Sequence, residues 1–119
     1  MTTATGPAYV AAVLTLYVGL PDTPDRASAH DRAVARAFFE REVPLDIVES
    51  ALLLGSLRRR NRPAAALPLA PVRSLAYFSS VVDEVLHQQL PPGYHDYLRA
   101  KAGQQLRPEV QKTTFSSDR

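Results

Sequence analysis

The sequence contains no cysteine, no tryptophan and a single methionine among its 119 residues. Without cysteine the chain can form no disulfide, no thiolate nucleophile and no zinc site with sulfur ligands. The absence of disulfides fits a reducing compartment, so we expect a cytoplasmic protein. The hydrophobic fraction of 45% is typical of a globular domain and argues against wholesale disorder.

Long apolar runs are also missing. A membrane-spanning helix needs about 20 consecutive apolar residues, and no run in this chain is that long. The best candidate is YVAAVLTLYVGL, at residues 9–20. No basic residue precedes it and no small-residue cleavage pattern follows it, so it does not read as a signal peptide. We interpret this segment as a core helix and expect no membrane partner.

No stretch alternates apolar and polar residues with the period of a β-strand. Apolar residues recur instead at helical spacing, in segments at about residues 8–19, 29–42, 45–60, 72–89 and 94–102. This pattern predicts an all-α fold, a compact bundle of four to five helices. We expect a single helical domain over residues 1–102 and a flexible tail over residues 103–119.

The segment at residues 45–60, LDIVESALLLGSLRRR, is apolar on nearly all sides. A helix of that kind is normally covered by its neighbours, so we expect it at the centre of the bundle. Pro44 suits the first turn of this helix, and the arginines at its end suit the helix dipole. In the preceding segment, Ser28 and Asp31 predict a capping box at the start of a helix.

The chain lacks a strong net charge, which is only +2, but its charges are unevenly distributed. Residues 1–57 carry four arginines and seven acidic residues, whereas residues 58–75 carry five arginines and no acidic residue. The basic character is therefore a local patch. Its members are Arg58, Arg59, Arg60, Arg62 and Arg73.

One interpretation of this patch is structural. Each cation at a helix C-terminus stabilises the helix by roughly 0.3–1 kcal/mol, and one or two are enough for that purpose. The remaining arginines would then be neutralised by carboxylates that the fold brings close. The candidates are Glu40, Glu42, Asp83 and Glu84.

The other interpretation is that the five arginines bind the phosphates of a nucleic acid. Arginine donates a planar fork of hydrogen bonds to phosphate and stays charged at any relevant pH. Five phosphate contacts predict a slope of roughly −4 to −5 for log affinity against log salt on duplex DNA. The N-terminus of the helix expected at 72–89 would add backbone donors near Arg73 and Ser74.

The sequence contains no recognisable catalytic or metal-binding motif. The three histidines, His30, His87 and His95, do not have the i, i+4 spacing of a helical zinc site, and no glycine-rich phosphate loop is present. We therefore expect no enzyme, no cofactor and no metal. A helix-turn-helix is disfavoured because residues 45–49, which would read the bases, are apolar or acidic.

The stretch from VPLDIVESALLLGSLRRRN to VRSLAYFSSVVDEVL resembles the C-terminal helical domain of DnaD-type primosomal replication proteins. Tyr77, Phe78, Val81 and Val82 match the second half of that family's pattern. The segment from residue 28 to residue 89 is also similar to small helical proteins of bacterial mobile elements. The resemblance implies a helical module of a replication or mobile-element system that binds DNA or a helicase-loading partner.

Two functions therefore remain open. The first is a DNA-associated module that holds phosphates through the five arginines. The second is a protein-interaction adaptor or homodimerising module, with a contact surface near aromatic residues. The candidates for that surface are Tyr9, Tyr17, Phe39, Tyr94 and Tyr97.

Overall fold

The computed structural model describes residues 5–63, 65–88 and 90–105. Within these ranges the chain forms five α-helices, one 3-10 helix and no strand, which confirms the predicted all-α fold. The elements in chain order are α1 (Gly6–Val18), α2 (Ala29–Glu40), α3 (Leu45–Arg60), η1 (Leu75–Phe78), α4 (Ser79–His87) and α5 (Tyr94–Gln105).

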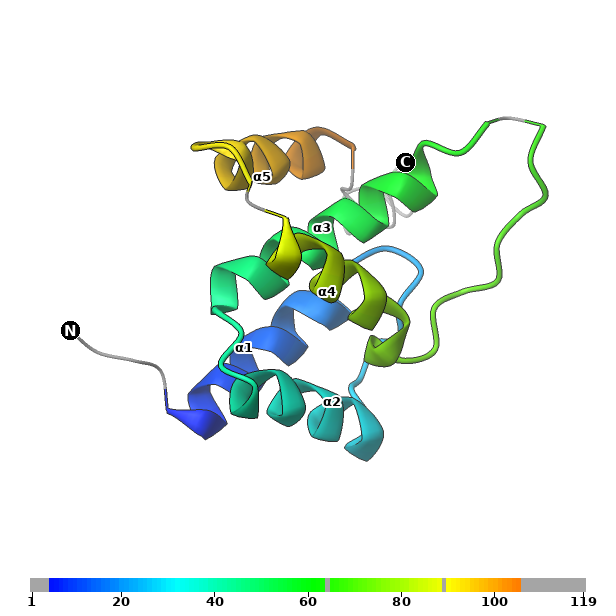
Figure 1. Ribbon diagram of the computed structural model, residues 1–119. Helices are drawn as coiled ribbons and strands as arrows, with labels where there is room; N and C mark the ends of the chain where they lie inside the picture. The colour runs from blue at the N-terminus through cyan, green and yellow to red at the C-terminus, as the bar shows by residue number, and fades with distance from the viewer. Residues whose placement is uncertain (1–4, 64, 89, 106–119) are drawn as a thin grey trace, which may run out of the picture.

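The helices form three levels, as Figure 1 shows. The first two helices pack against each other, α3 and α4 lie over them, and α5 lies on the other side of α3. The third helix touches α1, η1, α4 and α5. The connection between α3 and η1 extends away from the bundle as a long loop (Figure 1).

The first helix begins two residues before the predicted start. The hydroxyl of Thr5 accepts a hydrogen bond from the amide of Ala8, which satisfies one of the free donors of the first turn. Tyr9, Val13 and Tyr17 form the buried stripe of this helix. Burial raises the pKa of both tyrosines to about 12.

The second helix begins at the predicted capping box. The hydroxyl of Ser28 accepts from the amide of Asp31, and the Asp31 carboxylate accepts from the amide of Ser28. The Asp31 carboxylate is 1% exposed and also accepts from the amide of Leu75, 2.9 Å away. One side chain therefore caps α2 and joins it to η1. The helix ends at Glu40 because Glu42 has a φ of 62°, outside the helical region.

The third helix has the predicted boundaries. Its buried residues include two small ones, Gly55 and Ser56, which let a neighbour approach closely. A Cβ atom built on Gly55 would lie 2.8 Å from two ring carbons of Phe78. The Phe78 ring is fully buried and packs edge-on against Tyr17. Glycine at this position is therefore what allows η1 to pack directly against the α3 backbone.

The prediction of one helix over residues 72–89 is wrong in its first part. Residues 72–74 are not helical, and residues 75–78 form the 3-10 helix that precedes α4. The backbone amides at the start of this segment have tertiary partners: Val72 donates to the carbonyl of Asp22, and Leu75 donates to Asp31. These bonds hold the chain extended where apolar periodicity alone favours a helix.

The last helix is longer than predicted. It continues to Gln105, so residues 103–105 are helical and do not belong to a tail. The rest of the predicted tail, residues 106–119, lies outside the described residues. Leu98 and Ala102 are the buried positions of α5. Among the residues that the structure describes, no helix is long and apolar enough to cross a membrane.

Candidate nucleic-acid interface

The five arginines of the predicted site occupy the last turn of α3, the loop after it and the segment before η1. Arg58, Arg59 and Arg60 form the last turn of α3, and Asn61 is its C-cap. Cations at this end of a helix interact favourably with its free carbonyl groups. The surroundings of the five side chains differ sharply.

Arg58 is bound to a carboxylate of the same chain. Its two terminal nitrogens donate to the two oxygens of Glu84 at 2.9 and 2.6 Å, so the pair is bidentate. This ion pair joins the end of α3 to α4. The hydrogen bonds from Arg58 hold the pKa of the Glu84 carboxyl below its usual value. Glu84 is one of the four candidates for neutralisation that the sequence offers.

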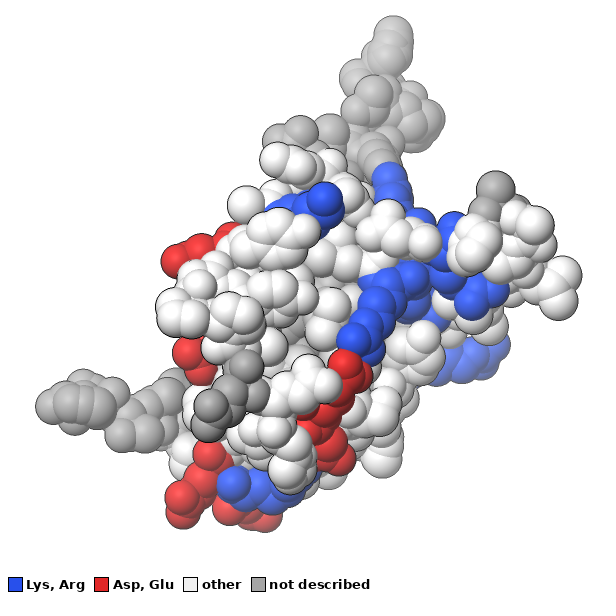
Figure 2. Space-filling view, turned by 45° about the horizontal axis from the view of Figure 1, so that its top comes forward, with Lys and Arg blue, Asp and Glu red and all other residues white. Residues whose placement is uncertain are grey.

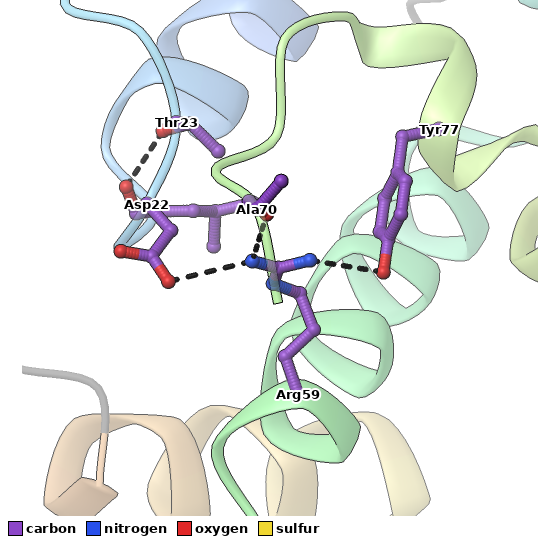
Figure 3. Close-up of polar contacts among 6 residues, drawn as sticks. Asp22, Thr23, Arg59, Ala70 and Tyr77 are labelled. Atoms are coloured by element: carbon purple, nitrogen blue, oxygen red, sulfur yellow. Dashed lines mark hydrogen bonds and ion pairs between the residues drawn. The ribbon is translucent and has the colours of Figure 1, made fainter. Parts of the chain in front are cut away.

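Arg59 is the most enclosed of the paired arginines, with a side chain that is 10% exposed (Figure 3). Its guanidinium donates to the hydroxyl of Tyr77 at 3.1 Å, to the carbonyl of Ala70 at 2.9 Å and to a carboxylate oxygen of Asp22 at 3.4 Å. These partners come from η1, from the loop after α3 and from the loop between α1 and α2. Arg59 therefore joins three segments of the chain, a role that local sequence does not reveal.

The other three arginines are exposed. Arg62 donates to the carbonyl of Leu67 at 2.7 Å, which leaves its charge uncompensated. Within the described ranges, Arg60 and Arg73 make no side-chain hydrogen bond and none of the three forms an ion pair. Three of the five predicted positive charges are thus available to an external anion.

Four of the arginines surround two adjoining recesses beside the long loop. Arg59, Arg60 and Arg62 line one recess of about 500 Å³, together with Ser56, residues of the loop and one carboxylate, Asp22. Arg58, Arg59 and Arg62 line a smaller recess of about 350 Å³. Arg73 lines neither recess. The fold therefore gathers the four arginines at the end of α3 and in the loop after it around these two recesses.

The surface carries this charge in one area. In Figure 2 most of the lysine and arginine side chains of the visible face lie together on one side, and a single basic side chain extends from them to meet acidic ones. The hydroxyl of Ser56 is buried at the larger recess and has no hydrogen-bond partner among the described residues. An anion in this recess would meet a predominantly cationic wall.

The expected contribution from a helix N-terminus near Arg73 is not available. The amide of Leu75 already donates to Asp31, and the amide of Ala76 donates to the hydroxyl of Ser74. The segment there is a 3-10 helix of four residues. The first two amides of this 3-10 helix, those of Leu75 and Ala76, are therefore used within the protein.

A polar cluster between α3 and α5 is formed by residues that the sequence does not predict to meet. The hydroxyl of Ser50 lies 2.6 Å from Nδ1 of His95, and Nε2 of His95 lies 3.2 Å from a carboxylate oxygen of Glu49. Glu49 also accepts two hydrogen bonds from Arg99, each 3.0 Å long. Because Ser50 and His95 are 45 positions apart, only the packing of α5 on α3 brings them together.

This cluster has the residue types of a nucleophile, a base and an orienting carboxylate. Ser50, however, is 1% exposed and lies inside α3, where backbone amides are used by the helix. No pair of amides is free there to hold an oxyanion, which acyl transfer requires. We interpret the cluster as the polar part of the contact between α3 and α5.

Among the described residues, no group of three or more histidine, cysteine, aspartate or glutamate side chains is arranged to hold a metal ion. No family model, no curated protein and no solved structure matches this chain.

Proposed function

We propose that the protein is a non-enzymatic helical module that binds the phosphate backbone of a nucleic acid at the C-terminal end of α3. The observation that carries this proposal is a pair of exposed arginines, Arg60 and Arg62. Both line the recess of about 500 Å³, and neither forms an ion pair within the described residues. A replication or mobile-element context is the setting that the sequence resemblance implies. Phosphate contacts of this kind position a protein on DNA without reading its sequence.

The pairing of Arg58 and Arg59 changes the expected strength of binding. If both stay bound to Glu84 and Asp22, three arginines remain, and the log–log salt slope on duplex DNA should be about −3. A slope of about −4 to −5 would mean that nucleic acid displaces the two carboxylates. The slope therefore reports how many of the arginines contact phosphates.

The test compares two double variants that remove the same net charge. Arg60→Gln/Arg62→Gln removes the charges at the recess, and Arg32→Gln/Arg36→Gln removes two exposed charges from α2. Binding to short single- and double-stranded DNA is measured by fluorescence anisotropy between about 50 and 200 mM salt. We expect the first variant to lose about two units of salt slope and the second to lose little.

Two results would contradict the proposal. One is the absence of salt-dependent binding by the wild type at about 50 mM salt. The other is an equal loss in both variants, which would make net charge responsible and not the recess. In either case the protein-interaction role would take the place of nucleic-acid binding.

A further inference from the structure

The recess of about 500 Å³ beside the end of α3 is lined by three segments of the chain. They are the last turns of α3, the loop that follows it and Pro21–Asp22 in the loop after α1. The loop after α3 is held in place by Arg62, which donates to the carbonyl of Leu67, and by Arg59, which donates to the carbonyl of Ala70. The recess is therefore fixed by hydrogen bonds of the fold.

The charged side chains in the described lining of this recess are three arginines and one aspartate, so their net charge is +2. The aspartate is Asp22, whose carboxylate lies 3.4 Å from Arg59 and compensates the charge of that arginine (Figure 3). Arg60 and Arg62 account for the remaining charge, and neither forms an ion pair within the described ranges. An anion with two negative charges would therefore balance the recess, whereas an anion with one would leave it cationic.

A nucleic acid carries two kinds of phosphate, which differ in charge and in shape. An internal phosphodiester has one negative charge, and the strand continues on both sides of it. A terminal phosphate monoester has about 1.5 to 2 negative charges at neutral pH, three free oxygens and a strand on one side only. The terminal group matches the charge of the recess. Its single connection also suits a site lined by three segments, since the strand needs only one way out.

The rest of the lining suits the nucleotide to which such a phosphate belongs. The loop contributes the apolar side chains of Leu67, Pro68 and Leu69, and Leu67 is 81% exposed. Sites for small molecules have volumes of about 300–1,000 Å³ and combine apolar walls with a few polar groups, as this recess does. The hydroxyl of Ser56 is buried in the lining without a partner among the described residues, so a phosphate oxygen would satisfy it.

We propose that this recess binds the terminal phosphate monoester of a nucleic-acid strand, an inference that rests on the proposed function and names the group that the site prefers. The guanidinium groups of Arg60 and Arg62 donate to the phosphate oxygens. The sugar and base of the last nucleotide lie against the apolar side of the loop. Asp22 holds Arg59 in place but repels the phosphate, so it weakens the binding that the arginines favour.

The first test compares single-stranded oligomers of equal total charge by fluorescence anisotropy at about 50 mM salt. One oligomer carries a terminal phosphate, at either end of the strand, and the other has terminal hydroxyls and is two nucleotides longer. We expect about fivefold tighter binding of the phosphorylated oligomer near neutral pH, the upper limit for an ion pair that solvent reaches. At about pH 5 the monoester loses one charge, because its second pKa is about 6, and the preference should fall below about twofold. The charged groups that face it are the three arginines and Asp22, and no histidine is part of the described lining.

The second test uses two variants of the loop after α1 that remove the same charge. Asp22→Asn removes the carboxylate from the recess, and its amide oxygen can still accept from Arg59. Asp25→Asn is the matched control, because Asp25 is also exposed but lines a different groove. We expect Asp22→Asn to increase the preference for the terminal phosphate by about twofold to fivefold and Asp25→Asn to leave it unchanged. A gain in affinity cannot result from misfolding.

Equal binding of the two oligomers by the wild type would overturn the inference, and so would an equal effect of the two aspartate variants. Competition by a free nucleoside monophosphate as strong as that by the phosphorylated oligomer would overturn the assignment to the end of a strand. In each case salt-dependent binding of the hydroxyl oligomer would still support the proposed interface. If that oligomer does not bind either, the proposed function fails as well, so the two failures are distinguishable.

Discussion

Replacement of Asp31 is expected to be the most damaging single change to a polar residue in this structure. The carboxylate is 1% exposed and accepts hydrogen bonds of 2.9 Å from the amides of Ser28 and Leu75. The first bond completes the cap of α2, and the second joins α2 to η1, 44 positions along the chain. Asp31→Ala removes both acceptors and leaves the buried amide of Leu75 without a partner.

The magnitude follows from these two bonds. A lost helix cap costs about 1 kcal/mol. A hydrogen bond to a charged group contributes about 1.5–3 kcal/mol, and a buried donor left unsatisfied costs about 1–3 kcal/mol. These figures overlap, so we expect Asp31→Ala to lower the free energy of unfolding by about 3–5 kcal/mol. That is a large part of the roughly 5–15 kcal/mol that stabilises a typical domain.

Urea denaturation followed by circular dichroism measures the loss. Asp25→Ala is the matched control, because Asp25 is exposed and makes no side-chain hydrogen bond within the described residues; its effect should stay within about 0.5 kcal/mol. A loss below about 1 kcal/mol for Asp31→Ala would refute the reasoning. It would mean that the amide of Leu75 finds another acceptor when the carboxylate is absent.

The same carboxylate predicts a pH dependence with a definite sign. Burial alone would raise the pKa of Asp31, but the hydrogen bonds from the amides of Ser28 and Leu75 lower it below its usual value. Its contribution to stability is therefore complete above the unfolded pKa of about 3.9 and is lost as the pH falls through the folded value. Asp31→Asn should reduce the loss of stability below about pH 4, and an unchanged pH profile would contradict this assignment.

Two further pairs of substitutions test the packing by the same denaturation measurement. Tyr9→Phe should cost about 1–2 kcal/mol, because the Tyr9 hydroxyl donates to the buried carbonyl of Val43 at 2.7 Å. Tyr17→Phe should cost almost nothing, since the Tyr17 hydroxyl has no partner among the described residues, and equal losses would contradict both assignments. Gly55→Ala should destabilise by about 1–2 kcal/mol, because steric overlap with a buried ring outweighs the gain in helix propensity. Gly103→Ala, with open space around it, should stabilise by up to about 1 kcal/mol, and a stabilised Gly55→Ala would show that the ring can move.

Much of the fold could be predicted because helices depend on local signals. The boundaries of α3 follow from Pro44 at its start, from the apolar residues that continue to Leu57 and from the arginines of its last turn. The cap of α2 follows from Ser28 and Asp31, which lie three residues apart. Apolar spacing and capping residues are properties of short segments, so one sequence is enough to detect them.

Two of the features that the sequence did not predict share a physical cause, which is contact between distant segments. The stretch before α4 is extended because Val72 and Leu75 donate to Asp22 and Asp31, and neither partner is near in sequence. The Ser50–His95 pair is equally invisible before α5 is placed on α3. Helical periodicity at residues 72–74 is present in the sequence, but tertiary hydrogen bonds determine the conformation there.

The arginines of the candidate site show the same limit. The sequence counts five cations without a local acid, and it offers Glu84 as one tertiary partner among four. It gives no sign that Asp22, near the beginning of the loop after α1, would lie beside Arg59. Charge neutralisation is a property of the folded surface, so the number of free cations could not be counted from the chain.

The arginines of the cluster differ in what they do for the fold. The end of α3 must be joined to α4 and to the loops around it, and Arg58 and Arg59 do this through five hydrogen bonds to side chains and a carbonyl. A helix C-terminus needs no more than one or two cations for its own stability. Arg62 donates a hydrogen bond to the carbonyl of Leu67, but within the described residues neither Arg60 nor Arg62 has an acidic partner for its charge, and like charges held close together repel each other. An external polyanion would relieve that repulsion, which is why the proposed interface is centred on these two residues and not on the whole cluster.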